Sequence, residues 1–193
     1  MPFTTLDLSK QSGTSLPSTI TSLDATVLSG NLPAISGASL TGLTSGLSQV
    51  DQWRITTEFT GNATPINSNW ERNDDLFGVT GSGMSHSSGA WTFPATGQYL
   101  IIFTFIHQFD QTDGYTLFDI EGCSDGSSFN RIGRHHMGGS GGDHRTGYCN
   151  AVFNCNNTTT HLVRFTISNA NAANSTKGST GEQQTGATFI KLA

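Results

Sequence analysis

Residues 98–108 read QYLIIFTFIHQ, and this stretch decides the fold of the chain. Successive side chains of a β-strand point to opposite faces of its sheet. One face of this segment is apolar throughout and carries Tyr99, Ile101, Phe103 and Phe105. The opposite face is also apolar and carries Leu100, Ile102 and Ile106. A strand in a two-layer sandwich has only one inner face, so the second apolar face predicts a cover supplied by another copy of the domain.

The rest of the chain has the composition of strands and turns. Gly accounts for 23 of the 193 residues, only 12% of residues are charged, and Ser, Thr and Asn are frequent. These features disfavour helix interiors. Strands are predicted, between turn-forming residues, at 54–59, 76–79, 98–108, 115–121, 129–135, 148–155, 161–168 and 187–192. Such a series predicts an all-β sandwich or jelly roll.

The composition changes near residue 50. Residues 1–50 contain one aromatic side chain, Phe3, whereas aromatic residues recur from Asp51 onward. We therefore expect residues 1–50 to be an extended anchor and stem with little helix, and residues 51–193 to be a folded knob. The Leu- and Gly-rich stretch 28–47 cannot bury its own leucines. It is either a disordered linker or a segment ordered by identical copies or by a neighbouring protein.

Two segments of the knob resemble a known family. Residues 91–101, WTFPATGQYLI, place an aromatic residue, Pro, Gly and Tyr before an apolar strand, and residues 186–193, GATFIKLA, end the chain in a strand. Both resemble complement-type globular heads and tumour-necrosis-factor-like jelly rolls, over about residues 51–193. Upstream, residues 31–43, NLPAISGASLTGL, are similar to stem repeats of bacteriophage fibre and capsid-associated proteins.

The resemblance implies a jelly roll of about ten strands that forms a homotrimer, with one sheet of each subunit facing the three-fold axis. The residues predicted to lie in that interface are Leu100, Ile102, Ile106 and Phe189. Collagen-like Gly-X-Y triplets and a disulfide framework are missing from the sequence. Their absence favours a viral protein over an animal secreted one.

Charge, hydropathy and cysteine content indicate which partners to exclude and the state of the thiols. The net charge is −5 and the nine basic residues are scattered, so we expect no nucleic-acid partner. No run approaches the roughly 18 apolar residues of a membrane helix, so we expect no membrane insertion and no classical secretion signal. Cys123, Cys149 and Cys155 are an odd number, and the last two lie too far apart along one strand to bridge. We expect buried, reduced thiols.

Three patterns of chemically active residues were weighed and none predicts a catalytic residue, a metal or a cofactor. Residues 138–142, GGSGG, match Gly-x-Ser-x-Gly but lack the strand and helix of a nucleophile elbow, so they predict a loop. His135, His136, Asp143 and His144 could ligate a metal but have no diagnostic spacing. The pairs Asp119 with Glu121 and Asp74 with Asp75 have no cleft context, so they predict solvated surface.

Ligand recognition is predicted on loops, including 138–146 and 171–184. The candidate receptor or ligand residues are Trp70, Tyr115, His135, His136, His144 and Arg145. Trp70, Tyr115 and Tyr148 would suit a sugar if they were exposed, and would equally suit a core. The sequence leaves both interpretations open.

We expect a bacteriophage virion structural protein, a homotrimeric fibre or surface decoration that is assembled in the host cytoplasm. Its N-terminal segment, with Phe3, Leu6 and Leu8, would anchor it to other virion proteins, and its knob would bind a host-surface glycan or protein. The alternative is a soluble carbohydrate-binding lectin not tied to a particle, for which the N-terminus would be dispensable. A glycan-degrading enzyme, the third hypothesis, would lose turnover when one acidic residue is replaced.

Overall fold

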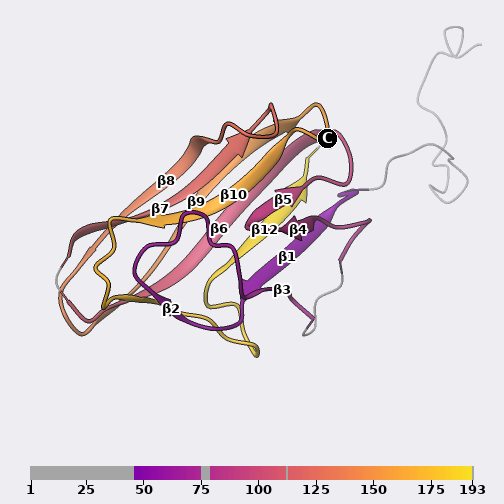
Figure 1. Ribbon diagram of the computed structural model, residues 1–193. Helices are drawn as coiled ribbons and strands as arrows, with labels where there is room; N and C mark the ends of the chain where they lie inside the picture. The colour runs from indigo at the N-terminus through magenta and orange to yellow at the C-terminus, as the bar shows by residue number, and fades with distance from the viewer. Residues whose placement is uncertain (1–45, 75–78, 112, 193) are drawn as a thin grey trace, which may run out of the picture. The chain divides into compact units, whose positions relative to one another are not determined.

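The computed structural model describes residues 46–74, 79–111 and 113–192, which fold as a sandwich of two antiparallel sheets (Figure 1). The all-β prediction is confirmed: the described residues contain strands and turns and no helix, and hence no helix able to span a membrane. The predicted anchor residues Phe3, Leu6 and Leu8 lie outside the described residues, as do positions 28–45 of the predicted stem 28–47 and positions 76–78 of the predicted strand 76–79.

The first sheet is centred on β6 (Gly97–Phe109). One edge of β6 pairs along its whole length with β9 (Asp143–Cys155). Its other edge pairs first with β12 (Gly186–Lys191) and then with β11 (Ser175–Thr176). The sheet continues from β12 to β1 (Val50–Ile55) and β3 (Trp70–Arg72), and from β11 to β2 (Phe59–Thr60).

The second sheet has five strands in the order β4, β5, β10, β7, β8. Their bounds are Ser85–Ser87 for β4, Ala90–Thr92 for β5, Leu162–Ser168 for β10, Asp113–Cys123 for β7 and Asn130–Gly139 for β8. The two sheets stack face to face, with β8 and β9 as neighbouring edge strands of opposite sheets (Figure 1).

The core follows from the alternation in β6. Tyr99, Ile101, Phe103 and Phe105 are all fully buried, as predicted for one face of this strand. The ring of Phe105 stacks on Phe118 of β7 with centroids 3.8 Å apart, and Phe103 contacts Phe165 of β10 at 4.8 Å. The second sheet therefore buries the inner side chains of β6. It does not cover the outer side chains of this strand.

The strand registers define two ends of the sandwich. At the proximal end, Val50 at the start of β1 lies beside Ile190, which lies beside Leu100 near the start of β6. At the distal end, β2 lies beside β11, which lies beside His107 and Gln108 near the end of β6. Figure 1 shows β2 and the start of β1 at opposite ends of the first sheet. The distal end therefore lies farthest from the point where the chain enters the sandwich.

An aromatic cluster at β4 and β5 predicts a dependence of stability on pH. The centroid of the His86 ring lies 4.3 Å from that of Trp91. It lies 6.0 Å from that of Trp53 and 6.3 Å from that of Trp70. Burial lowers the pKa of His86 below its ordinary value of 6.5. The unfolded chain therefore takes up a proton at a higher pH than the folded chain, so stability present above pH 6.5 is lost as pH falls toward the folded pKa.

We expect the melting temperature to fall between pH 7.5 and pH 5.5, and to fall less in His86→Gln. Gln is uncharged over this range and can still accept the hydrogen bond that His86 Nε2 receives from Gly89 N–H. Thermal melts of both proteins across this range measure the difference. An equal decrease in the two proteins would assign the pH dependence to another group.

Candidate functional site

The outer face of the first sheet carries an apolar stripe across four strands. Leu100 on β6 lies opposite Val152 on β9 and Ile190 on β12, and Ile190 lies opposite Val50 on β1. We call Val50, Leu100, Val152 and Ile190 the outer stripe. Val152 is 61% exposed, and the other three are half-buried. Part of this face is covered within the subunit, because Gln183 Nε2 donates to Thr104 Oγ1 on β6 at 3.3 Å.

The same face continues toward the distal end. Ile102 and Ile106 are half-buried on β6, on the side opposite the core, as their positions in the alternation predicted. Tyr148 of β9 lies opposite Thr104 and is 64% exposed. Among the described residues, the exposed apolar side chains on this face are Val152 and Tyr148, and Asn150 lies between them on β9.

Phe189 differs from the sequence prediction. The sequence predicts Phe189 in the subunit interface. In the structure its side chain is 1% exposed and lies in the core, near Trp91 and Phe165. The alternation of β12 explains the difference, because Ala187 and Phe189 face inward whereas Ile190 faces outward. Ile190 therefore takes the place of Phe189 in the candidate interface.

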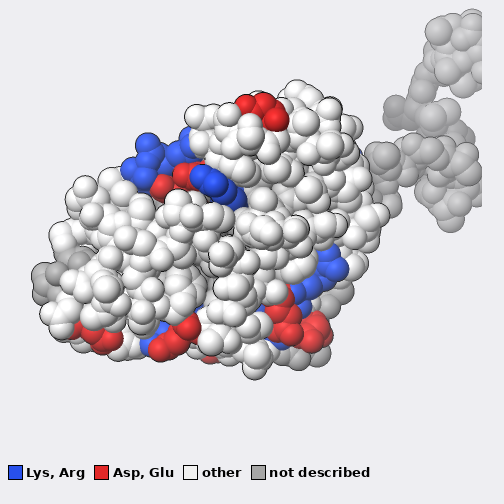
Figure 2. All heavy atoms as spheres, in the orientation of Figure 1, with Lys and Arg blue, Asp and Glu red and all other residues white. Residues whose placement is uncertain are grey.

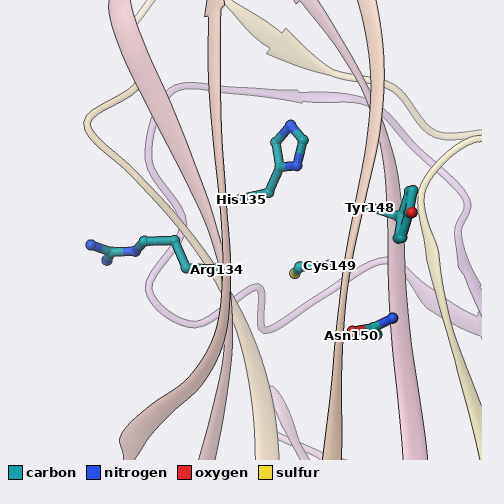
Figure 3. A pocket seen from close by; sticks show the side chains of 5 residues that line it. All are labelled: Arg134, His135, Tyr148, Cys149 and Asn150. Atoms are coloured by element: carbon teal, nitrogen blue, oxygen red, sulfur yellow. The ribbon is translucent and has the colours of Figure 1, made fainter.

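A cleft of about 340 Å³ lies beside this face, where β8 and β9 meet without pairing. It is lined by Arg134, His135, Tyr148, Cys149 and Asn150 (Figure 3). The His135 ring points into the gap between the strands, and Arg134 points away from it. The strands approach closely here, because a Cβ at Gly133 would lie 2.9 Å from the carbonyl oxygen of Asn150.

Cys149 faces this cleft but is chemically quiet. Its thiol is buried, and burial, with a smaller effect from Asp119, raises its pKa to about 12. At pH 8 only about one thiol in ten thousand would then be the reactive thiolate. Cys123 and Cys155 are also buried and free, as the sequence predicted.

We expect a thiol reagent such as 5,5′-dithiobis(2-nitrobenzoate) to label none of the three cysteines of the folded protein within minutes at pH 8. All three should react after unfolding in guanidinium chloride, which is the control for total thiol. The absorbance of the released thiolate measures both. Rapid labelling of one thiol in the folded state would show that the cleft opens to solvent.

The predicted ligand residues lie in the distal half of the sandwich, but they do not form one site. Tyr115 is 46% exposed, and its ring lies 5.5 Å from that of His136 on the outer face of the second sheet. His144 and Arg145 are exposed at the start of β9. The predicted loop 138–146 is therefore wrong in part, because only residues 140–142 lie between β8 and β9. Arg145 donates to Asp143 Oδ2 at 2.9 Å. Hydrogen bonds from Ser140 N–H and then Arg145 lower the pKa of Asp143.

Trp70 and His135 border the core. The Trp70 ring meets Trp91 edge to face at 4.6 Å, and its Nε1 donates to Ile66 O at 2.9 Å. The His135 ring lies 5.4 Å from Phe105. Both side chains are half-buried, so Trp70 serves packing here rather than offering an open platform for a sugar.

The carboxylates considered for catalysis are held by arginines, and the predicted solvated surface is wrong for Asp119. Asp119 is 3% exposed and accepts two hydrogen bonds of 2.6 Å from Arg134, and Glu121 accepts one of 2.6 Å from Arg164. The bond to Asp119 raises the pKa of Arg134. Asp74 pairs with Arg54 at 2.6 Å, and Asp75 lies outside the described residues. Figure 2 shows a largely uncharged surface on which acidic and basic groups mostly lie close together.

No three His, Cys, Asp or Glu side chains come together as a possible metal site anywhere in the described ranges. His136 and His144 lie on separate strands of opposite sheets.

Neither a protein-family model nor a curated protein matches the sequence. Several solved structures match the fold. They include murine APRIL in crystals at pH 5.0, with 16% identity and a TM-score of 0.56 over 75% of this chain and 98% of that chain. Vertex protein P5 of bacteriophage PRD1 has 18% identity and a TM-score of 0.52 over 77% and 99%. Eiger TNF from S. frugiperda has 9% identity and a TM-score of 0.52 over 77% and 94%.

At these identities the likeness concerns architecture. APRIL and Eiger share with this chain the arrangement of two antiparallel sheets described above. The described part of the chain has the tumour-necrosis-factor-like jelly-roll fold.

Proposed function

We propose that this protein is a homotrimeric structural protein of a bacteriophage virion, a fibre or surface decoration that presents its jelly roll for attachment. The observation that carries the proposal is the two-faced strand β6, whose inner face is fully buried and whose outer face continues into the exposed side chains Val152 and Tyr148. A face of this kind is stabilised when a sister subunit covers it.

The energy available is large enough to hold subunits together. Burying a large aliphatic side chain contributes about 1.5 to 3 kcal/mol. The outer stripe together with Ile102, Ile106 and Tyr148 offers several such side chains on each copy. Three copies would bury them around one axis.

A closed ring is favoured over a two-fold pair by the presence of two unlike surfaces. The apolar face of β6 and the cleft between β8 and β9 lie next to each other but differ in shape, since one is a sheet face and the other an open edge. Packing the face of one copy against the edge of the next is a heterologous contact, which gives a ring when the rotation between copies closes. The fold resemblance favours three copies in that ring.

The virion assignment is supported by the likeness to the PRD1 vertex protein and by the resemblance of residues 31–43 to phage stem repeats. In the proposal, Phe3, Leu6 and Leu8 contact other virion proteins during assembly in the host cytoplasm. The distal end then projects toward a glycan or protein of the host surface. The protein's work is binding rather than catalysis, and it needs no cofactor and no nucleic acid.

Sedimentation equilibrium of the full chain tests the assembly. We expect a species of three times the subunit mass of 20.5 kDa at micromolar concentration. A stable folded monomer would remove the physical basis of the proposal. Immunogold electron microscopy of purified particles of the encoding phage tests the location, and the position of the label separates a tail fibre from a head fibre or capsid decoration.

A further inference from the structure

A second pocket, of about 220 Å³, lies at the distal end in the loop between β2 and β3. Its apolar lining residues, which we call its floor, are Phe59, Ala63 and Ile66, and they belong to the core or pack against it. Its polar lining residues, which we call its rim, are Asn62, Asn67, Asn69, Thr60 and Ser68. We call it the loop pocket. None of its lining residues was predicted as a ligand residue.

The loop pocket is built on a fixed backbone. Gly61 N–H donates to Asn174 O at 2.9 Å. Ala63 and Ile167 of β10 exchange two backbone hydrogen bonds of 2.9 and 2.7 Å, and Ile66 N–H donates to Phe165 O at 2.9 Å. The loop is thus tied to the edge of the second sheet at several points. Because the loop is already fixed, ligand binding would lose little conformational entropy in ordering it, which favours binding.

Three of its polar side chains make no hydrogen bond within the described part of the fold, whereas a fourth does. Asn62 already accepts a hydrogen bond from Ala170 N–H at 2.8 Å. Within the described ranges, the side chains of Asn67, Ser68 and Asn69 have no hydrogen-bond partner, and all three are exposed. In another loop, Asp125 serves its own turn by accepting hydrogen bonds from Ser127 N–H and Ser128 N–H. The rim of the loop pocket therefore offers donors and acceptors to a ligand.

The chemistry of the lining selects the ligand class. Amides both donate and accept, and hydroxyls do the same, so together they complement the hydroxyl groups of a sugar. The aromatic and aliphatic floor complements the C–H face of a sugar ring. No charged residue lines the pocket, and the nearby Glu58 and Lys177 pair with each other at 2.7 Å. The volume lies below the roughly 300 to 1,000 Å³ of pockets for drug-sized ligands, so it suits one sugar unit.

We propose that the loop pocket binds a single neutral sugar unit, such as an end group of a surface polysaccharide. The inference deepens the proposed function by naming a ligand class and a site. It rests on that function in one respect, namely that the distal end is free in the assembled trimer. β2 ends the strand path β6, β11, β2, so the pocket lies away from the outer stripe.

Saturation-transfer difference NMR on the full chain tests the proposal. The probes are the methyl glycosides of glucose, galactose, mannose, N-acetylglucosamine and rhamnose, with N-acetylneuraminic acid as the charged comparison, each at millimolar concentration. We expect transfer to at least one neutral glycoside and none to the acid. The double variant Asn67→Ala, Asn69→Gly should weaken binding about tenfold or more, as expected for lost hydrogen bonds.

The variants are chosen to leave the fold intact. Asn69 has φ 64°, which glycine adopts without strain, and Asn67 is exposed. Ser68→Trp, at the exposed rim, should block the pocket by bulk. Asn156→Ala is the matched control, since it removes an exposed amide from a loop at the proximal end and should bind as the wild type does.

Three outcomes would overturn the proposal: no transfer to any neutral glycoside, transfer to the acid alone, or binding that persists in both pocket variants. Sedimentation equilibrium on the same samples separates this failure from that of the proposed function. A trimer that binds no sugar would contradict only the proposed sugar site. A monomer would contradict the proposed trimeric assembly.

Discussion

Replacing Ile102 with Glu is expected to convert the proposed trimer into folded monomers. Ile102 lies on the outer face of β6, between Asn150 of β9 and Thr188 of β12, so its side chain would meet a sister subunit without disturbing the core. Each copy would lose the burial of an aliphatic side chain and would have to bury an unpaired carboxylate. The combined cost is roughly 10 kcal/mol for the trimer, which is beyond what micromolar assembly tolerates.

The matched control is Leu117→Glu. Leu117 is also a half-buried aliphatic residue on an outer sheet face, but it belongs to β7 of the second sheet. It should leave the trimer mass unchanged. Sedimentation equilibrium measures the mass, and far-ultraviolet circular dichroism confirms that the variants keep their strands. An Ile102→Glu protein that still sediments as a trimer would show that the outer face of β6 is not the interface.

The two-faced pattern of residues 98–108 was sufficient to predict the most important strand and its inner and outer residues. Its alternation depends only on backbone geometry, so Tyr99, Ile101, Phe103 and Phe105 face the core as predicted. The same reasoning failed for Phe189, because an isolated Phe on a short strand could point either way. Counting from the inward Ala187 would have assigned it to the core.

The short strands could not be read from the sequence. β2, β4, β5 and β11 have two or three residues, too few for an alternating pattern. β5 and β11 pair with the longer strands β10 and β6, and β4 and β2 pair in turn with β5 and β11. The loop pocket was missed for a related reason. Its Asn residues look like ordinary turn formers, and only the hydrogen bonds of the folded loop show that Asn67 and Asn69 are left over.

Removing the Asp51 carboxylate is expected to cause the largest loss of stability of any single polar substitution considered. Asp51 is 2% exposed, and its carboxylate accepts hydrogen bonds from Trp53 Nε1, Arg72 and Met84 N–H at 2.6 to 3.1 Å. It thereby joins β1, β3 and the segment before β4. Asp51→Ala leaves these donors without their acceptor and Arg72 without its counter-charge. Arg72 is 38% exposed, so most of the cost comes from Trp53 Nε1 and Met84 N–H, and each buried donor left without an acceptor costs about 1 to 3 kcal/mol.

Differential scanning calorimetry of the trimer should show a fall in melting temperature of about 10 °C or more for Asp51→Ala. The control is Glu58→Ala, which breaks the ion pair between Glu58 and Lys177. Glu58 is 54% exposed, so this change should lower the free energy of unfolding by less than about 1 kcal/mol. If the buried network is the cause, the double variant Asp51→Asn, Arg72→Met should lose less than the sum of its single variants, because the second change removes the orphaned charge. Strict additivity would mean that the two residues act separately, and the loss would then reflect local packing at β1.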